Sequence, residues 1–460
     1  MAVVGGLFLR PWEVMLFSVF ISIVCWIANF VNRIVRQPYM DEIFHVPQAQ
    51  RYCRGDFASW DPKLTTPPGL YLTSVPFSWL AECTLDVLRA TNILFCVANI
   101  YVMHLIRQHL HPTTSIMSSV SIALLPVNFF FTFLYYTDAG CIFCLLLVYL
   151  FYLNKRHYLS AVAGLAGVVF RQTAIVWVFF VACLTLAEIV ERHLRRSTKA
   201  QPPKATTTTT TTTHRSRPRT TSAPARSPLV ADVMWDAAKD CTGYALVGLA
   251  FVVFLHRNGG ITLGDKAAHE AVVHFTQIGY FLLFALMFGA PFVLSVQNFV
   301  DFIDFATKRP IVILVGSLVM HGLFENFLHV HPYLLSDNRH YTFYLWRRFL
   351  SKVEVRQGLI VLYTFVGYCL FACVRGHVKR SWLVLFALCT AITIVPQKLL
   401  EFRYFLWPYM LLRLHFREQP HQVAAETVAF VVINSITFYM FLYGTFIWKH
   451  DPVHIQRFMW

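Results

Sequence analysis

Charged side chains are scarce in this sequence, and their scarcity argues against most classes of soluble protein. Asp, Glu, Lys and Arg make up 14% of the 460 residues, whereas about a quarter of a soluble globular protein is charged. Hydrophobic residues reach 57%, and they gather in separate runs of about 15 to 25 residues, the length at which a helix crosses a bilayer. The sequence therefore predicts an all-α polytopic membrane protein.

Two further features are missing. No Asn-x-Ser/Thr sequon occurs, and no pair of the 11 cysteines has the spacing of a zinc site. Most cysteines lie in or beside apolar runs, but Cys53 and Cys83 fall in the first loop and can pair if that loop faces an oxidising compartment. His269, Glu270 and His274 lack the spacing of a zinc protease, so we predict neither a metal site nor a cofactor.

Thirteen apolar runs are candidates for membrane spans, and we expect about 12 to 13 transmembrane helices. The runs are roughly 14–31, 85–106, 116–136, 138–153, 159–170, 173–189, 241–256, 274–296, 311–330, 358–374, 382–397, 402–415 and 425–448. The fifth and sixth runs are close enough to form one broken helix, which accounts for the range in the expected number.

Basic residues indicate how the spans are oriented, because short cytoplasmic loops are enriched in Lys and Arg. A cytoplasmic N-terminus puts the short basic turns at 154–157, 308–309 and 375–380 on the cytoplasmic side as well. The opposite side then receives the loops 32–84, 257–273, 331–357 and 398–403. The net charge of +15 lies mostly in loops between spans, so it favours an orientation in the membrane and no nucleic-acid partner.

This layout divides the chain into three parts. Residues 1–190 form an N-terminal transmembrane module that contains the loop 32–84, and residues 241–460 form a C-terminal module. Between them, the segment 191–240 is rich in basic residues and contains eight consecutive threonines, so much of it cannot bury enough apolar surface to order itself. We expect a disordered cytoplasmic linker there.

An acidic pair, Asp41-Glu42, follows the first apolar run among polar residues that stable packing does not require. A carboxylate at a membrane boundary can accept a proton from a sugar hydroxyl, and a neighbouring like charge or partial burial would raise its pKa toward neutrality. Most such pairs are solvated loop acids. Here His45 and Gln48 follow in the same loop with groups that can bind sugar hydroxyls, and we interpret the pair as a candidate catalytic site.

Two loops offer further polar candidates. Prolines stiffen the stretch that presents Trp60 and Asp61, which can stack on a sugar and hydrogen-bond to it. A packed turn onto the next helix explains those prolines equally well. In the second loop, Lys266 and His269 offer donors for a phosphate and Asp265 offers an acceptor for sugar hydroxyls.

Arginines close to apolar runs are the last group of candidates. Arg339 and His340 are suited to a lipid-linked phosphate because a guanidinium can bind phosphate bidentately, while Asp337 before them is a candidate for binding acceptor sugar hydroxyls. Arg171 and Arg403 each lie between two apolar runs, where an ionisable group usually faces a cavity or a partner. For these two, a structural ion pair is as good an explanation as phosphate binding.

Taken in chain order, these motifs resemble the dolichyl-phosphate-glucose-dependent α-1,2-glucosyltransferases, which add the terminal glucose of the N-glycan precursor and belong to the GT-C superfamily. The matching segments are 38–71, 136–138, 170–177, 263–275, 331–348 and 401–408. The resemblance implies a GT-C type fold in the endoplasmic reticulum membrane, with an active site that faces the lumen. It does not extend to the segment 191–232 or to the C-terminal tail.

The resemblance also implies a reaction between two lipid-linked partners. Glucose would pass from dolichyl-phosphate-glucose to Glc2Man9GlcNAc2-pyrophosphoryl-dolichol, with inversion of a β-phosphate to an α-1,2 linkage and without a tightly held metal. Asp41 is the first choice for the base, and Glu42 would hold the acceptor or orient its neighbour, although the sequence does not separate the two roles. Cationic side chains would stabilise the charge that grows on the departing phosphate.

Two alternatives remain open at this point. A dolichyl-phosphate-mannose-dependent mannosyltransferase of the same superfamily would share the acidic pair, and only the resemblance of the later motifs argues against it. A transporter is the alternative of a different class. It would be expected to carry ionisable residues deep within several spans, whereas here the polar motifs concentrate in loops.

Overall fold

The computed structural model describes residues 10–200, 229–266 and 270–460, and helices dominate it. Seven helices are long and apolar enough to cross a membrane, judged by length and composition. They are α1 (Pro11–Ile34), α4 (Leu85–Leu110), α9 (Ala174–Ala200), α10 (Leu229–Asn258), α11 (Thr276–Val293), α16 (Val353–Val374) and α19 (Pro420–Tyr443). Four shorter apolar helices are α7 (Asp138–Leu153), α8 (His157–Phe170), α13 (Pro310–Asn326) and α17 (Arg380–Ile394). The predicted all-α polytopic membrane protein is confirmed.

The remaining elements are short and connect or flank these helices. They are α2 (Glu42–Cys53), α3 (Gly69–Ser74), η1 (Val75–Trp79), α5 (Ile116–Ala123), α6 (Pro126–Phe131), α12 (Val296–Lys308), α14 (Pro332–Ser336), α15 (Tyr341–Leu345), η3 (Trp346–Leu350), η4 (Phe402–Phe405) and α18 (Leu406–Leu414). A two-stranded antiparallel ribbon, β1 (Phe446–Trp448) and β2 (Asp451–Gln456), follows α19.

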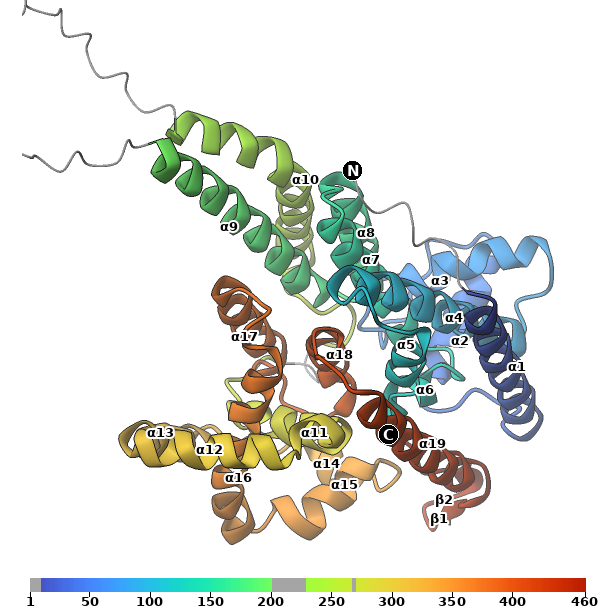
Figure 1. The fold of residues 1–460 in the computed structure, drawn as a ribbon. Helices are drawn as coiled ribbons and strands as arrows, with labels where there is room; N and C mark the ends of the chain where they lie inside the picture. Colours follow the sequence, from blue (N-terminus) through green and yellow to red (C-terminus); the bar gives the residue numbers. More distant parts are fainter. Residues whose placement is uncertain (1–9, 201–228, 267–269) are drawn as a thin grey trace, which may run out of the picture.

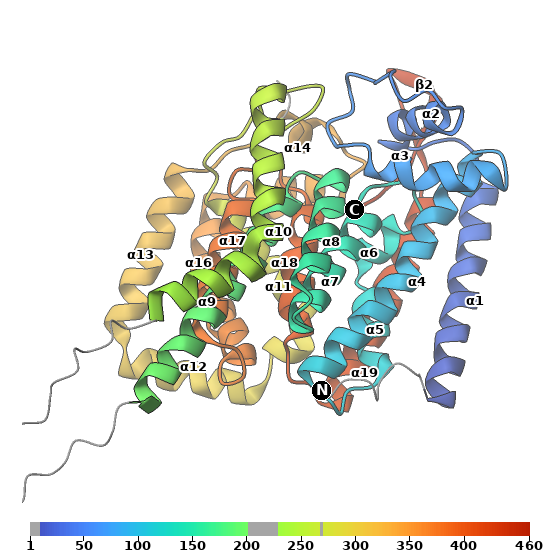
Figure 2. The same ribbon diagram turned by 90° about the horizontal axis from the view of Figure 1, so that it is seen from above.

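The helices run back and forth between two faces of the molecule (Figure 2). One face carries α2, α3, α14 and β2, and we call it the loop face. The opposite face carries α12, and ion pairs gather the basic turns there: Lys379 pairs with Glu191 at 2.6 Å and Arg375 with Asp301 at 3.7 Å. Every loop that holds a candidate site residue therefore lies at the other end of the helices from the basic turns.

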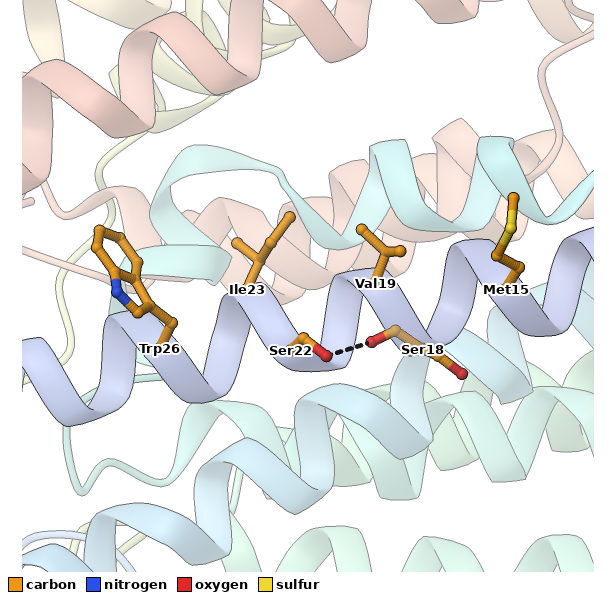
Figure 3. A pocket seen from close by; sticks show the side chains of 6 residues that line it. All are labelled: Met15, Ser18, Val19, Ser22, Ile23 and Trp26. Carbon is orange, nitrogen blue, oxygen red and sulfur yellow. Dashed lines mark hydrogen bonds between the residues drawn. The ribbon is translucent and has the colours of Figure 1, made fainter.

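The exposed apolar side chains show which surfaces face lipid. The outward side of α1 presents Met15, Val19, Ile23 and Trp26 in a row, because residues three and four apart share one side of a helix (Figure 3). A shallow hollow of about 420 Å³ lies along this row. The hydroxyl of Ser22, which lines it, donates to the carbonyl of Ser18 in the same helix. Such a surface is stable against hydrocarbon and unstable against water.

Two of the predicted spans are interrupted rather than continuous. The run 116–136 divides into α5 and α6, because Pro126 lacks an N–H group and is accommodated in the first turn of a new helix. The run 402–415 divides into the turn η4 and the helix α18, which leaves Arg403 outside a regular α-helix. Within the described residues, eleven apolar helices therefore stand where 12 to 13 were predicted.

The predicted disordered linker is wrong at both of its ends. Helix α9 continues through 191–200, and α10 already begins at Leu229. The two helices pack side by side, and His193 lies 2.9 Å from Asp236 across them, so tertiary contact orders residues that composition alone would leave unfolded. Residues 201–228, including the eight threonines, lie outside the described part of the chain.

A disulfide fixes the first loop. Cys53, the last residue of α2, is bonded to Cys83, which stands just before α4. The sequence left this pairing open. The bond closes a loop of about 30 residues and joins the end of α2 to the start of a long apolar helix. It restricts the unfolded chain and holds the intervening Trp60 stretch close to the loop face.

Candidate active site

Asp41 lies on the loop face, where the chain turns between α1 and α2. It is the residue that precedes α2, and its backbone N–H donates to the hydroxyl of Tyr136 at 3.2 Å. Met40 before it has a φ of 56°, a left-handed conformation that is uncommon for a residue other than glycine. The Asp41 side chain is 44% exposed. This carboxylate is therefore held at its backbone and open at its tip.

Arg403 joins Asp41 to two other carboxylates. Its guanidinium lies 3.3 Å from Asp41 Oδ2 and 3.6 Å from Asp138 Oδ2, and it also pairs with Glu401. Asp138 pairs in turn with Arg171. These five residues form what we call the charge cluster, with three carboxylates and two guanidiniums.

Aromatic rings support the guanidinium of Arg403 from the side. Its central carbon lies 4.9 Å from the ring centre of Phe131 and 5.0 Å from that of Tyr136. Rings at this distance attract a cation and restrict its movement. Arg171 and Arg403 are thus both paired with carboxylates, as the structural interpretation expects, and Arg403 also contacts Asp41.

The expectation that surroundings raise the pKa of Asp41 is wrong. Burial acts in that direction and is the largest single influence, but Arg403 together with nearby His45 and His340 outweighs it. The net effect holds the pKa of the Asp41 carboxyl below its usual range. Asp41 is consequently ionised at neutral pH and ready to accept a hydrogen bond.

Glu42 points away from Asp41 into the protein. It is fully buried, and Arg89 binds its two carboxylate oxygens at 2.8 and 2.6 Å. The backbone N–H groups of Tyr39 and Tyr135 donate to the same carboxylate at 3.0 and 2.7 Å. Each oxygen therefore accepts two hydrogen bonds, and the group anchors the start of α2 to α4.

The other candidates of the first loop hold that loop together. His45 is buried and hydrogen-bonded to Tyr71 at 2.7 Å. Gln48 is also buried; its amide nitrogen donates to the carbonyl of Ser59 and its oxygen accepts from the N–H of Asp61. His45 thus connects α2 to α3, and Gln48 connects α2 to the stretch around residue 60.

Trp60 and Asp61 lie at the edge of this assembly. The Trp60 ring packs edge-on against Tyr71, and its indole N–H has no hydrogen-bond partner among the described residues. One oxygen of Asp61 accepts from the backbone of Lys63. The indole nitrogen of Trp60 is buried, whereas Asp61 keeps a second carboxylate oxygen that accepts no hydrogen bond from the described residues.

The second loop packs directly on the first. Gly264 has a φ of 62°, and a Cβ at this position would collide with the carbonyls of Pro62 and Leu64. Lys266 is exposed and donates to the carbonyl of Asn258. Asp265 is exposed as well. His269 lies outside the described residues, and its predicted role stays a prediction.

Asp337 holds the guanidinium of Arg339 in the third loop. Two nitrogens of Arg339 reach the two carboxylate oxygens of Asp337 at 2.8 and 2.7 Å, and a third reaches Gln456 at 3.2 Å. The Arg339 side chain also lies 4.7 Å from the ring centre of Trp448. His340 is partly exposed, and its Nδ1 is hydrogen-bonded to the carbonyl of Trp460 at 2.9 Å.

Sequence reasoning missed Arg89 and Tyr39. Arg89 has a signal in retrospect, because a lone ionisable residue within an apolar helix usually has a partner. Tyr39 has none, since tyrosines are common at membrane boundaries. In the described part of the chain, no three His, Cys, Asp or Glu side chains group in a way that could hold a metal ion. The hollow on α1 and one of about 430 Å³ beside α12 contain no candidate residue.

Comparison with known proteins shows which family this sequence matches. Residues 35–414 match the model of the DIE2/ALG10 family. The chain is 38% identical to a protein of Mus musculus, 37% to one of Homo sapiens and 34% to one of Arabidopsis thaliana. These alignments cover 94 to 95% of this chain and 96% of each relative. All three relatives are named Dol-P-Glc:Glc(2)Man(9)GlcNAc(2)-PP-Dol alpha-1,2-glucosyltransferase. No solved structure shows a significant match.

The two adjacent acids should behave differently when they are neutralised. Glu42→Gln leaves the Arg89 guanidinium buried without a counter-charge, and we expect it to lower the free energy of unfolding by about 3 to 5 kcal/mol. Asp41→Asn, at a partly exposed position, should change it by less than about 1 kcal/mol. Thermal unfolding of the two purified variants beside the wild type measures the difference. Equal melting temperatures for both would contradict the structural role of Glu42.

Proposed function

This chain is a member of the DIE2/ALG10 family, and from that premise we propose that it transfers glucose from dolichyl-phosphate-glucose to Glc2Man9GlcNAc2-pyrophosphoryl-dolichol in α-1,2 linkage. The observation that carries the proposal is the ionised, half-exposed carboxylate of Asp41 within the stretch that matches the family. The relatives compared above are all named as glucosyltransferases, and nothing favours a mannosyl donor or a transporter.

The chemistry is a single displacement at the glucose C1 carbon. Asp41 takes the proton from the 2-hydroxyl of the acceptor's terminal glucose, and that oxygen forms a bond to C1 of the donor glucose. The bond between C1 and the phosphate oxygen breaks on the opposite face, and dolichyl phosphate leaves with the electron pair. A β-phosphate donor thereby gives an α product. One carboxylate oxygen of Asp41 faces Arg403 and the other has no hydrogen-bond partner among the described residues, so it is available to the hydroxyl.

Charge balance indicates which cations can serve the departing phosphate. The charge cluster holds three carboxylates against two guanidiniums, so Arg171 and Arg403 are already compensated. Arg339 is likewise engaged by Asp337. Lys266 donates to a carbonyl, and within the described ranges it pairs with no carboxylate.

We propose Lys266 as the first group for the donor phosphate, followed by His340 and then by Arg339, whose charge is shared with Asp337; the role of His269, which lies outside the described residues, stays a prediction. Arg171 and Arg403 then act at the site through the charge that they place next to Asp41. The growing charge on the phosphate would be met by these side chains, and the proposal includes no resident metal ion or other cofactor.

We propose that the acceptor sugars bind to side chains near the surface of the first three loops. Asp61 keeps one carboxylate oxygen without a hydrogen bond from the described residues, Trp60 offers the face of its ring, and Asp265 is exposed in the loop that packs on them. Asp337 is partly exposed. His45 and Gln48 are buried in contacts within the loop, so we propose that they shape the acceptor site without touching the sugar.

We also propose that the protein lies in the endoplasmic reticulum membrane with its loop face in the lumen. The basic turns gather on the opposite face, as they do on the cytoplasmic side of membrane proteins. The disulfide between Cys53 and Cys83 belongs to the loop face, and disulfides form in oxidising compartments such as this lumen.

Removing the base should abolish transfer while leaving the protein folded. We expect Asp41→Asn to lower kcat by about 100-fold to 10,000-fold, the usual contribution of a general base, with donor binding and melting temperature unchanged. The assay follows glucose transfer by the purified protein to a diglucosylated lipid-linked acceptor, with dolichyl-phosphate-mannose offered in parallel. Asp86→Asn, an exposed position in the first turn of α4, is the matched control. An active Asp41→Asn variant would show that Asp41 is not the base. Transfer of mannose without transfer of glucose would show that the donor is dolichyl-phosphate-mannose.

The pH dependence should reveal the neighbour of the base. Asp41 is active when deprotonated, so kcat/KM should fall as the pH drops through its pKa. Because this pKa is lowered, the fall (the acid limb of the profile) should lie below the pH range in which an ordinary aspartate titrates. Arg403→Gln removes the cation that opposes burial, so the pKa of Asp41 rises and the limb should move to higher pH. Arg403→Lys, which keeps a charge, should move it less. The same limb in all three proteins would show that Arg403 does not act on the titrating group.

Engineered glycosylation can establish the orientation. Phe57→Asn completes a sequon with Ser59 in the first loop, and Arg156→Thr completes one that begins at Asn154 on the opposite face. With the loop face in the lumen, expression in microsomes should glycosylate the first variant and leave the second unmodified. A mobility shift after glycosidase digestion measures this, and the reverse pattern contradicts the proposed orientation.

A further inference from the structure

The end of the chain returns to the candidate active site. After α19 ends at Tyr443, the ribbon β1–β2 and the residues that follow it lie at the loop face, the face at which Figure 2 draws both α2 and β2. We call residues 446–460 the C-terminal arm. It lies beyond the stretch that the family model matches, and the motifs of the sequence do not extend to it.

The arm holds Tyr39, two residues before Asp41. The Tyr39 hydroxyl donates to the carbonyl of Arg457 at 2.7 Å and accepts from the N–H of the same residue at 2.8 Å. Burial raises the pKa of Tyr39 to about 12, so the hydroxyl keeps its proton at physiological pH. Arg457 is itself fixed, because its guanidinium donates to the carbonyls of Phe441 and Leu442 at the end of α19.

The arm also pairs with the loop that carries Arg339 and His340. The N–H of Met459 donates to the carbonyl of Arg339 at 2.9 Å, and the N–H of Tyr341 donates to the carbonyl of Met459 at 3.1 Å. The Trp460 carbonyl binds His340 Nδ1. Residues 339–341 are therefore paired with the arm through the backbone as well as through side chains.

A third contact leads to Arg403. The indole of Trp460 is buried and lies 5.7 Å, between ring centres, from Phe402, the residue just before Arg403. It also packs on Phe288 of α11 and on Tyr341. One short segment thus touches the neighbours of Asp41, of His340 and of Arg403, which otherwise belong to three distant parts of the sequence.

Asp41 lies between two anchors as a result. On one side Tyr39 is fixed to the arm, and on the other Glu42 is fixed to Arg89. Met40 spans the gap in a left-handed conformation that is unfavourable outside glycine and that an unanchored chain would relax. The Tyr39 backbone N–H still donates to Glu42 and the Asp41 N–H to Tyr136, so loss of the hydroxyl contact loosens the turn that presents the Asp41 carboxylate to Arg403 while Glu42 stays in place.

We propose that the C-terminal arm is a positioning element of the active site, which fixes Asp41 against Arg403 and His340 through Tyr39 and Trp460. In this proposal the arm takes no part in making or breaking covalent bonds and does not contact the reacting atoms. The proposal rests on the proposed glucosyl transfer. The arm would act by keeping Asp41 correctly oriented, because a displacement of about 1 Å at a reacting group can lower the rate about 100-fold.

Tyr39→Phe tests the proposal with the loss of a single oxygen. The ring keeps its edge-on contact with Phe441, so folding should be preserved. We expect kcat for glucose transfer to fall about tenfold or more, the KM for the donor to change less than about twofold, and the acid limb of kcat/KM to move to higher pH. Trp460→Ala, which removes the contact with Phe402, should act in the same direction.

The matched control is Tyr439→Phe, an exposed phenol on the outer side of α19. It should leave kcat and the pH profile as in the wild type. Wild-type values of kcat and acid limb in Tyr39→Phe overturn the proposal, and so does a loss that follows the fraction of folded protein without a shift of the limb. A folded wild-type protein that transfers no glucose overturns the proposed function itself, independently of the variants.

Discussion

The guanidinium of Arg403 is the interaction on which the site depends. It brings together Asp41 from the first loop, Asp138 from the start of α7 and Glu401 from the turn before α18. Ionised groups near a membrane are costly when they lack partners, and Arg403 is the one partner in the charge cluster that all three carboxylates share. The positions of three distant segments are therefore coupled, and the fold around them is built so that they meet at one point.

Much of the architecture could be predicted because it is set by local properties. An apolar run of sufficient length specifies a membrane-crossing helix wherever it occurs, and α1, α4, α11 and α16 follow the predicted runs closely. The gathering of polar motifs on one face also follows, since successive crossings alternate in direction. Interruptions were harder to foresee: a single Pro126 divides one run, while another folds into a short turn so that Arg403 can reach the acids.

The pairing of charges could not be predicted, because it depends on contacts between residues far apart in sequence. Asp41 and Glu42 are neighbours with the same chemistry, yet α2 begins between them and directs one toward solvent and the other toward Arg89, 47 positions away. The same non-local contacts reverse the expected effect of burial on the pKa of Asp41. The C-terminal arm carries no recognisable motif, and its role becomes visible only where its backbone pairs with the third loop.

The long pair α9 and α10 extends away from the rest of the helices (Figure 1). Their outer parts are joined by His193 and Asp236, so the two points at which the intervening segment begins and ends are held close together by the helices themselves. A fluorescent domain or affinity tag inserted between these two helices would therefore be attached at both of its ends to a pair of packed helices, at a distance from the charge cluster.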